Sequence, residues 1–324
     1  MTARHEVGGV KSVVITGVGT AIPGVREAAD LLAPGAHDGG FDPDTGLKGR
    51  EMRHKDRASR LALRAVAPAL RQAGLLSDDG ERYTGPGDTT AVVISTNLGN
   101  LDSVCDFVDT IAAHTVTGLS PLGLPHTSSN VIAGWIAIRY GMRGPNLTVC
   151  NGATSGADAL HWAHNLLAAR RADTVVVIGV EPHTEPAARL LDDGSGRSPL
   201  DGAVALVLES SERVAARGAR PLAVLERSVR AADSATARAH ALHGESALAA
   251  GLWLGLAEDA ATASAVDLTA RLGHCSGALG VLQAAAGVAH LAAGGPGPVL
   301  ATSGGGATDD AAAALVLTGA GEVP

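Results

Sequence analysis

The sequence predicts an α/β fold in which buried strands alternate with helices, and three kinds of segment carry this prediction. Apolar runs at 11–19 and 173–181 have the nearly continuous hydrophobicity of strands covered on both faces of a sheet. Apolar residues recur at helical spacing over 55–73, as in an amphipathic helix. Over 144–161 a β-branched run passes through small residues into a helical pattern, which predicts a strand-to-helix elbow.

The same patterns place the other elements in chain order. A polar loop with glycine and proline at 81–88 leads into a strand at 91–96. Apolar periodicity and its interruptions then predict a strand and turn at 220–233, a helix at 246–263, an alanine-rich helix ending near 293 and a strand at 313–318.

Composition is that of a well-buried globular protein. The chain has 324 residues, of which 46% are hydrophobic, and its mean hydropathy is +0.18. This length suits one large domain or two halves that share a core. Aromatic residues make up only 2%, so alanine, valine and leucine must fill the core. The 42 glycines suit a fold with many tight strand–helix junctions.

Charge and cysteine usage exclude several classes of function. The formal net charge of −8 gives no electrostatic reason to bind nucleic acid. No apolar run approaches the length of a membrane span, and residues 1–10 lack the apolar core of a signal peptide, so we expect a soluble, cytoplasmic protein without membrane contact. Cys105, Cys150 and Cys275 are far apart and lack CxxC spacing, so neither a disulfide framework nor a metal site is expected, nor a cofactor.

The elbow is the segment best suited to carry chemistry. Its small residues stand where a helix begins, and the unpaired N–H groups and the dipole of a helix N-terminus favour a thiolate or an oxyanion. A nucleophile is therefore expected at this turn.

Three separated motifs resemble the β-ketoacyl synthases of fatty-acid and polyketide assembly. GPNLTVCNGATSGADALHWA at 144–163 resembles their active-site segment, GHCSGALG at 273–280 resembles their second histidine turn, and VLATSGGGATDD at 299–310 resembles their closing glycine-rich segment. The resemblance runs from residue 11 to 318. It implies a thiolase-like fold, layered αβαβα, with two related halves of mixed sheet and buried helices between them.

The domain organisation follows from the same resemblance. We expect residues 1–324 to form a single thiolase-like domain, with an N-terminal half at about 11–212 and a shortened C-terminal half at about 213–320. The shortening is inferred because only one helical segment separates His240 and His243 from the second histidine turn, where the family has a His-Gly-Thr turn and more chain.

The resemblance also assigns roles to residues of the site, and it implies that the family's nucleophile is absent from this chain. The family's nucleophilic cysteine falls at Ala153, whose methyl group cannot be acylated. The family's lysine falls at Thr269, and of its two histidines only His274 remains. His274 is either a donor to a thioester carbonyl or a structural remnant.

Four further residues are predicted to line the acyl pocket. Thr154 and Ser155 are expected to cap the helix and shape the pocket. Ser303 and Gly305 occupy positions where bulky phenylalanines gate the cysteine in the family. Cys150 is expected within the strand, as a structural cysteine.

Two surfaces are predicted to meet partners. Arg50, Arg53, Lys55 and Arg57 belong to the densest positive cluster of the chain, which is either a solvated helix face or a docking patch for an acidic acyl carrier protein. The segment 121–140 resembles a family helix that packs at the dimer interface, with His126 expected at the surface or in a cap.

Three functions remain open from the sequence. The first is a non-catalytic, chain-length-factor-like subunit that pairs as a heterodimer with an active ketosynthase and shapes its acyl tunnel, as Ala153 favours. The second is a divergent acyl-thioester transferase that uses a hydroxyl and His274. The third is an acyl-binding or regulatory module that works alone.

Overall fold

The structure, a computed structural model, describes residues 12–33, 42, 47, 52, 55–192, 194, 196–243, 250–255 and 265–322. Its ten strands form one hydrogen-bonded sheet of mixed direction in the order β3-β2-β4-β5-β1-β6-β10-β9-β7-β8. The strands are β1 (Val13–Ala21), β2 (Thr90–Ser95), β3 (Asn146–Val149), β4 (Thr174–Glu181), β5 (Gly202–Ser210), β6 (Ala223–Ala231), β7 (Leu252–Leu254), β8 (Ala265–Val266), β9 (Val299–Gly304) and β10 (Ala312–Gly319).

The sheet is built from the same five-strand arrangement twice. β1 to β5 stand in the order 3-2-4-5-1, and β6 to β10 repeat this order in mirror sequence from the middle of the sheet outward. Parallel and antiparallel pairings repeat as well: β2 is parallel to β3 and β4, and β7 is parallel to β8 and β9. The halves join where β1 pairs with β6. The fold is therefore the thiolase-like architecture of two related halves, whereas the exact boundary near residue 212 stays a prediction.

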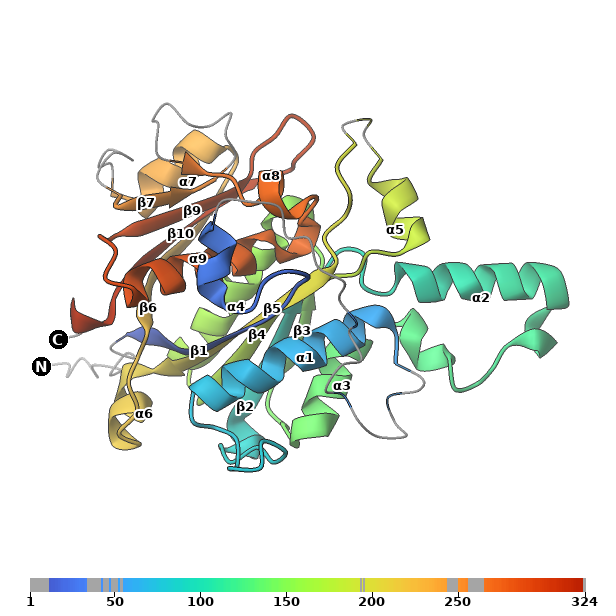
Figure 1. Ribbon diagram of the computed structural model, residues 1–324, viewed down its shortest axis with the longest axis horizontal. Helices are drawn as coiled ribbons and strands as arrows, with labels where there is room; N and C mark the ends of the chain where they lie inside the picture. Colours follow the sequence, from blue (N-terminus) through green and yellow to red (C-terminus); the bar gives the residue numbers. More distant parts are fainter. Residues whose placement is uncertain are drawn as a thin grey trace, which may run out of the picture.

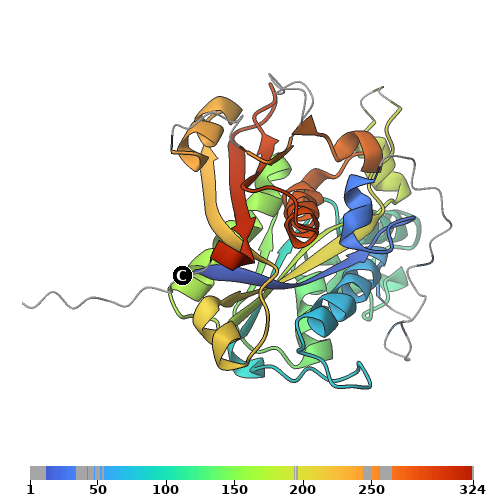
Figure 2. The same cartoon turned by 60° about the vertical axis from the view of Figure 1, so that its left-hand side comes forward.

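Helices complete a five-layer arrangement (Figure 1). The helices are α1 (Arg57–Gln72), α2 (Leu101–His114), α3 (Val131–Tyr140), α4 (Ser155–Ala168), α5 (Glu185–Leu190), α6 (Ser211–Ala216), α7 (Ser234–Ala241), α8 (Thr269–Leu272) and α9 (Leu279–Ala292). One core cluster joins α1 and α3 to the outer face of the first half, and another joins α7 to the outer face of the second. The largest cluster places α4 and α9 between the halves, and Figure 2 views α9 nearly end-on there.

Two glycines let the central helices touch. A Cβ atom on Gly156 would lie 2.6 Å from the backbone nitrogen of Gly280, and one on Gly280 would lie 2.3 Å from that of Ala157. Only glycine admits such a close approach of two backbones. The first turns of α4 and α9 are thereby brought together, and the two motifs that precede them meet.

Most predicted elements are present, with two corrections. The predicted helix at 246–263 is wrong where the structure describes it, because Leu252–Leu254 is the strand β7. Trp253 and Leu254 are buried there and pair in parallel with β9, so three consecutive large apolar residues serve an inner strand. Cys150 lies just after β3 rather than within it, and it is exposed.

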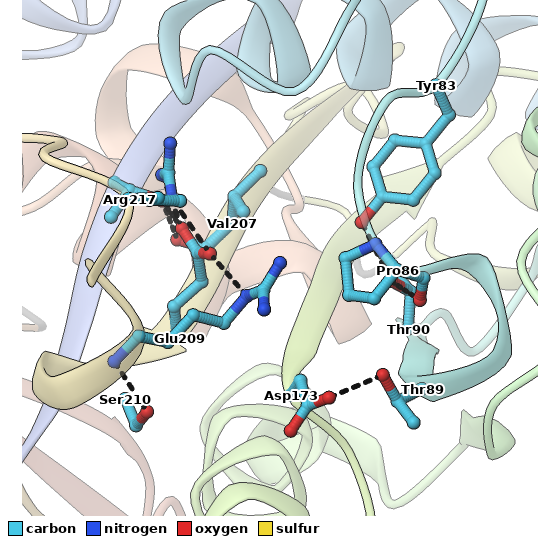
Figure 3. Close-up of polar contacts among 11 residues, drawn as sticks. Tyr83, Pro86, Thr89, Thr90, Asp173, Val207, Glu209, Ser210 and Arg217 are labelled. Carbon is cyan, nitrogen blue, oxygen red and sulfur yellow. Dashed lines mark hydrogen bonds and ion pairs between the residues drawn. The ribbon is translucent and has the colours of Figure 1, made fainter. Parts of the chain in front are cut away.

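A buried ion cluster anchors the middle of the sheet (Figure 3). The carboxylate of Glu209 in β5 has no exposed surface. It accepts hydrogen bonds from Arg217 Nη2 at 2.6 Å, Arg213 Nε at 3.1 Å and the Thr16 hydroxyl at 2.8 Å. These contacts fasten α6 to two neighbouring strands and compensate the charge of the carboxylate.

The segment from α2 to the start of α3 projects from the body of the molecule (Figure 1). We call residues 101–127 the arm. Helix α2 has no buried residue, and the arm returns through two 3₁₀ turns, Val116–Gly118 and Leu124–Thr127. Within the described ranges, no helix combines the length and apolarity needed to cross a membrane.

Candidate functional site

Three loop segments meet at the elbow, and the Asn97 side chain holds two of them. Its amide Nδ2 donates to the carbonyl of Gly152 and to the hydroxyl of Ser276, each at 2.9 Å. Gly152 belongs to the elbow, and Ser276 belongs to the second histidine turn. The third segment is the end of β9, where a Cβ atom on Gly304 would lie 3.0 Å from Cγ2 of Thr154. The motifs that the sequence singled out separately thus form one site.

From a buried position, Glu181 holds the loops of this site together through hydrogen bonds. It ends β4, is 1% exposed, and accepts hydrogen bonds from the backbone N–H groups of Asn97, Leu98 and Gly277 and from the Thr96 hydroxyl. Burial raises the pKa of its carboxyl, while the four donors act in the opposite direction. One side chain therefore ties the ends of β2 and β4 to the 3₁₀ turn Ser276–Ala278 that leads into α9.

Ala153 stands in the 3₁₀ turn Gly152–Thr154 that leads into α4. Gly152 has φ +65, a left-handed conformation that lets the chain turn sharply out of β3. The structure thus places position 153 beside a helix N-terminus, as the sequence predicts, and the side chain there is a methyl group. It offers neither a nucleophile nor a hydrogen-bond donor.

The two hydroxyls after Ala153 are engaged with neighbouring polar groups. Thr154 Oγ1 donates to Asp158 Oδ2 at 2.8 Å. Ser155 Oγ accepts from the Asn151 N–H at 2.6 Å and lies 2.9 Å from Asn97 Oδ1. Neither hydroxyl accepts from a backbone N–H inside α4, so the prediction that they cap this helix is wrong. Their hydrogen bonds hold the elbow against Asp158 of α4 and against Asn97 instead.

Asp158 is a site residue that the sequence analysis missed. Its carboxylate accepts from Thr154 Oγ1 and, at 3.0 Å, from Asn151 Nδ2, and Arg230 Nη1 lies 3.8 Å away. Asn97 and Glu181 were missed too. Each follows or ends a buried apolar strand, and polar residues at the ends of adjacent parallel strands are the signal that could have identified them.

The second histidine turn is held against the loop before β5. His274 N–H donates to the Ser198 carbonyl at 2.9 Å, and the His274 carbonyl accepts from Leu200 N–H at 3.0 Å. Thr269, at the family's lysine position, directs its N–H and hydroxyl to Asp267 Oδ1 at 2.8 and 2.7 Å. The side chain at position 269 therefore closes a local turn.

The closing segment provides no bulky gate. Ser303 is buried, and its hydroxyl meets no hydrogen-bond partner in the part of the chain that the structure describes. Gly305 has φ +85, and a Cβ atom there would lie 2.2 Å from Ser234 Oγ. The first residue of α7 thus fills the space that a side chain at position 305 needs.

The predicted basic patch is only partly described, and one of its residues is not a surface residue. Lys55 is buried, with its Nζ 3.6 Å from the centre of the Trp135 ring, so its assignment to a docking patch is wrong. Arg57 forms a two-bonded ion pair with Asp201 at 2.7 and 2.5 Å. Arg50 and Arg53 lie outside the described residues.

His126 is buried rather than at the surface. Its Nδ1 lies 2.8 Å from Asp56 Oδ2, and Asp56 caps α1 by accepting from the Ser59 N–H at 2.7 Å. The histidine thus pins the end of the arm to the first turn of α1. A catalytic role has no support from this position.

Cys150 is exposed and lies three residues before Ala153; partial loss of hydration and then the Glu181 carboxylate raise the pKa of its thiol. Burial likewise raises the pKa of Cys275, beside His274. Both thiols are protonated near neutral pH, and a thiol is a weak nucleophile. The raised pKa disfavours the thiolate, which is the nucleophilic form of cysteine, at both positions.

Comparison with known proteins agrees with this geometry. The profile of the β-ketoacyl synthase N-terminal domain matches residues 33–198, just over half of the chain. The chain is 30% identical over 206 residues to 3-oxoacyl-(acyl-carrier-protein) synthase 2 of Rhizobium meliloti (strain 1021), a match that covers 56% of this chain and 48% of that protein. The chain thus spans about half the length of the curated relatives it matches.

Solved structures extend the likeness to nearly the whole chain. The structure titled "The ishigamide ketosynthase/chain length factor" superposes with a TM-score of 0.76 at 25% identity, over 95% of this chain and 99% of that one. A type II polyketide ketosynthase solved with its acyl carrier protein has the same fold, with a TM-score of 0.77 at 17% identity and the same coverage. The profile match over residues 33–198 shows that the chain belongs to the β-ketoacyl synthase family, in agreement with the fold that these structures share.

Proposed function

We propose that this chain is a ketosynthase-like subunit without condensing chemistry of its own, which pairs with an active ketosynthase and shapes the tunnel for the growing acyl chain. The observation that carries the proposal is Ala153 at the elbow. Condensation in this family needs an acylated nucleophile at that position, and a methyl group cannot form a thioester. A second group of the family's site is absent as well. Thr269 stands at the position of the family's lysine, and its hydroxyl donates to Asp267.

The geometry disfavours the alternative, acyl transfer to an elbow hydroxyl. Thr154 is 2% exposed and Ser155 has no exposed surface. A thioester carbonyl cannot reach either oxygen without displacing the bonds to Asp158 or Asn97. Thr154 and Asp158 do form a hydroxyl–carboxylate pair, but its burial suits a structural contact.

The arm supports the pairing. Val108, Ile111, Val116, Leu122 and Leu124 of the arm are each between 42% and 67% exposed. Apolar groups gathered on a projecting segment mark a surface that another protein covers. A family member of the same fold, with an intact cysteine, is the partner that the proposal assigns to it. An acyl carrier protein is the second proposed partner, near Arg57.

Co-expression tests the pairing directly. We expect the chain alone to be poorly soluble or to form a homodimer, because the arm leaves apolar side chains in water, and to elute as a 1:1 complex when produced with a cognate ketosynthase of its host. Size-exclusion chromatography with light scattering measures both. A stable monomer that binds no ketosynthase of its host would contradict the proposal.

A further inference from the structure

An apolar groove of about 510 Å³ runs between α2 and α5. Leu101, Val104, Cys105 and Val108 of α2 form one wall, and Pro186 and Leu190 of α5 face them. The α2 residues follow the i, i+3, i+4, i+7 spacing of a single helix face. Val108 is 59% exposed and Leu190 64%, so the groove is open to an occupant.

The groove is bordered by negative charge. Asp102, Asp106 and Asp109 form a second stripe along α2, at the same helical spacing. Residues 98–130 contain these three acids and no lysine or arginine. On the opposite wall, Arg189 is already paired with Glu185 at 3.3 Å.

The acidic groups act on one another. Burial, followed by the carboxylates of Asp106, Asp56 and Glu185, raises the pKa of the Asp102 carboxyl. The arm contributes no lysine or arginine that would offset this repulsion. An occupant that brings positive charge would relieve it.

We propose that the groove binds an apolar segment of the ketosynthase partner in which lysine or arginine side chains flank the apolar ones. This inference rests on the proposed function and names the chemistry by which the partner is chosen. The apolar wall provides burial, and the aspartate stripe selects positive charge. The arm of a second copy would bring aspartates toward aspartates, and an acidic carrier protein would be repelled in the same way.

The test is a charge reversal in the groove. The double variant Asp106→Lys/Asp109→Lys is compared with Asp78→Lys, which makes a charge change on the exposed loop after α1. Association with the co-purifying ketosynthase is measured by surface plasmon resonance at 50 and 300 mM NaCl. We expect the double variant to associate about tenfold more slowly at the lower salt concentration, since charges at an interface mainly set the association rate. The control should associate like the unmodified chain, and melting temperatures should show that all three proteins are folded.

A second variant tests the apolar wall. Val108→Ser/Leu190→Ser should dissociate from the ketosynthase about tenfold faster, with the salt dependence of association retained. If the unmodified chain pairs but both double variants pair equally well at both salt concentrations, the groove is not the docking site, and the proposed function stands without it. A homodimer whose arm is protected from hydrogen exchange would overturn the inference in favour of a second copy. If the unmodified chain pairs with no ketosynthase, the inference and the proposed function both fail.

Discussion

Glu209→Ala is expected to lower the free energy of unfolding by about 3–5 kcal/mol, because it leaves two half-buried arginines without their anion. The carboxylate is fully buried, and Arg213, Arg217 and Thr16 all donate to it. The side chains of Arg213 and Arg217 retain 28% and 21% exposure, so partial solvation should keep the loss near the lower end of that range. Urea unfolding followed by circular dichroism measures it.

Glu212→Ala is the matched control. Glu212 is the neighbouring acid on α6 and is exposed, so its removal should change the free energy of unfolding by no more than about 0.5 kcal/mol. A loss below 1 kcal/mol for Glu209→Ala would mean that the two arginines find other partners, and that the cluster does not anchor α6 to the sheet.

Ala153→Cys is expected to restore a reactive thiol but not condensation. The new thiol would stand at the N-terminus of α4, which lowers the pKa of a cysteine, so iodoacetamide should modify it faster than Cys105 or Cys275. Acyl thioesters should acylate it slowly. Chain-extended product should stay at least about 10³-fold below that of an ordinary ketosynthase, because the donors that stabilise developing charge are missing.

The missing donors can be named. Thr269 is turned onto Asp267, and the sequence contains no His-Gly-Thr turn. His274 alone cannot serve both the thioester oxygen and the departing carboxylate of a malonyl extender. Mass spectrometry of the variant with acyl and malonyl thioesters separates the two steps. Extension at ordinary rates would show that other residues supply these contacts.

The local sequence pattern predicted those helices, strands and turns that a few neighbouring residues determine. The elbow at Ala153 is an example, since β-branched, small and helical positions follow one another within one segment. The family resemblance then supplied the thiolase-like arrangement. The two related halves came from the resemblance alone, because the order of the strands depends on hydrogen bonds between distant segments that no local pattern shows.

Contacts between distant segments account for the errors. The hydrogen bonds of Asn97 and Glu181 join strand ends more than 80 residues apart, so their polar side chains indicate a site only once β2 and β4 are known to be neighbours. Lys55 was placed on the surface by its charge, but Trp135 provides an aromatic face that covers it. At 252–254 the alanine-rich surroundings favoured a helix, but these residues form a strand because they pair with β9.

The central claim is that this chain carries no acyl nucleophile and works through a partner that does. Intact-mass spectrometry of the co-purified complex, incubated with an acyl thioester, tests it most directly. The account predicts an acyl adduct on the ketosynthase chain and none on this one, because Ala153 has no nucleophile and the raised pKa of Cys150 keeps its thiol protonated. A stoichiometric acyl adduct on this chain, mapped to Cys150, Thr154 or Ser155, would contradict it.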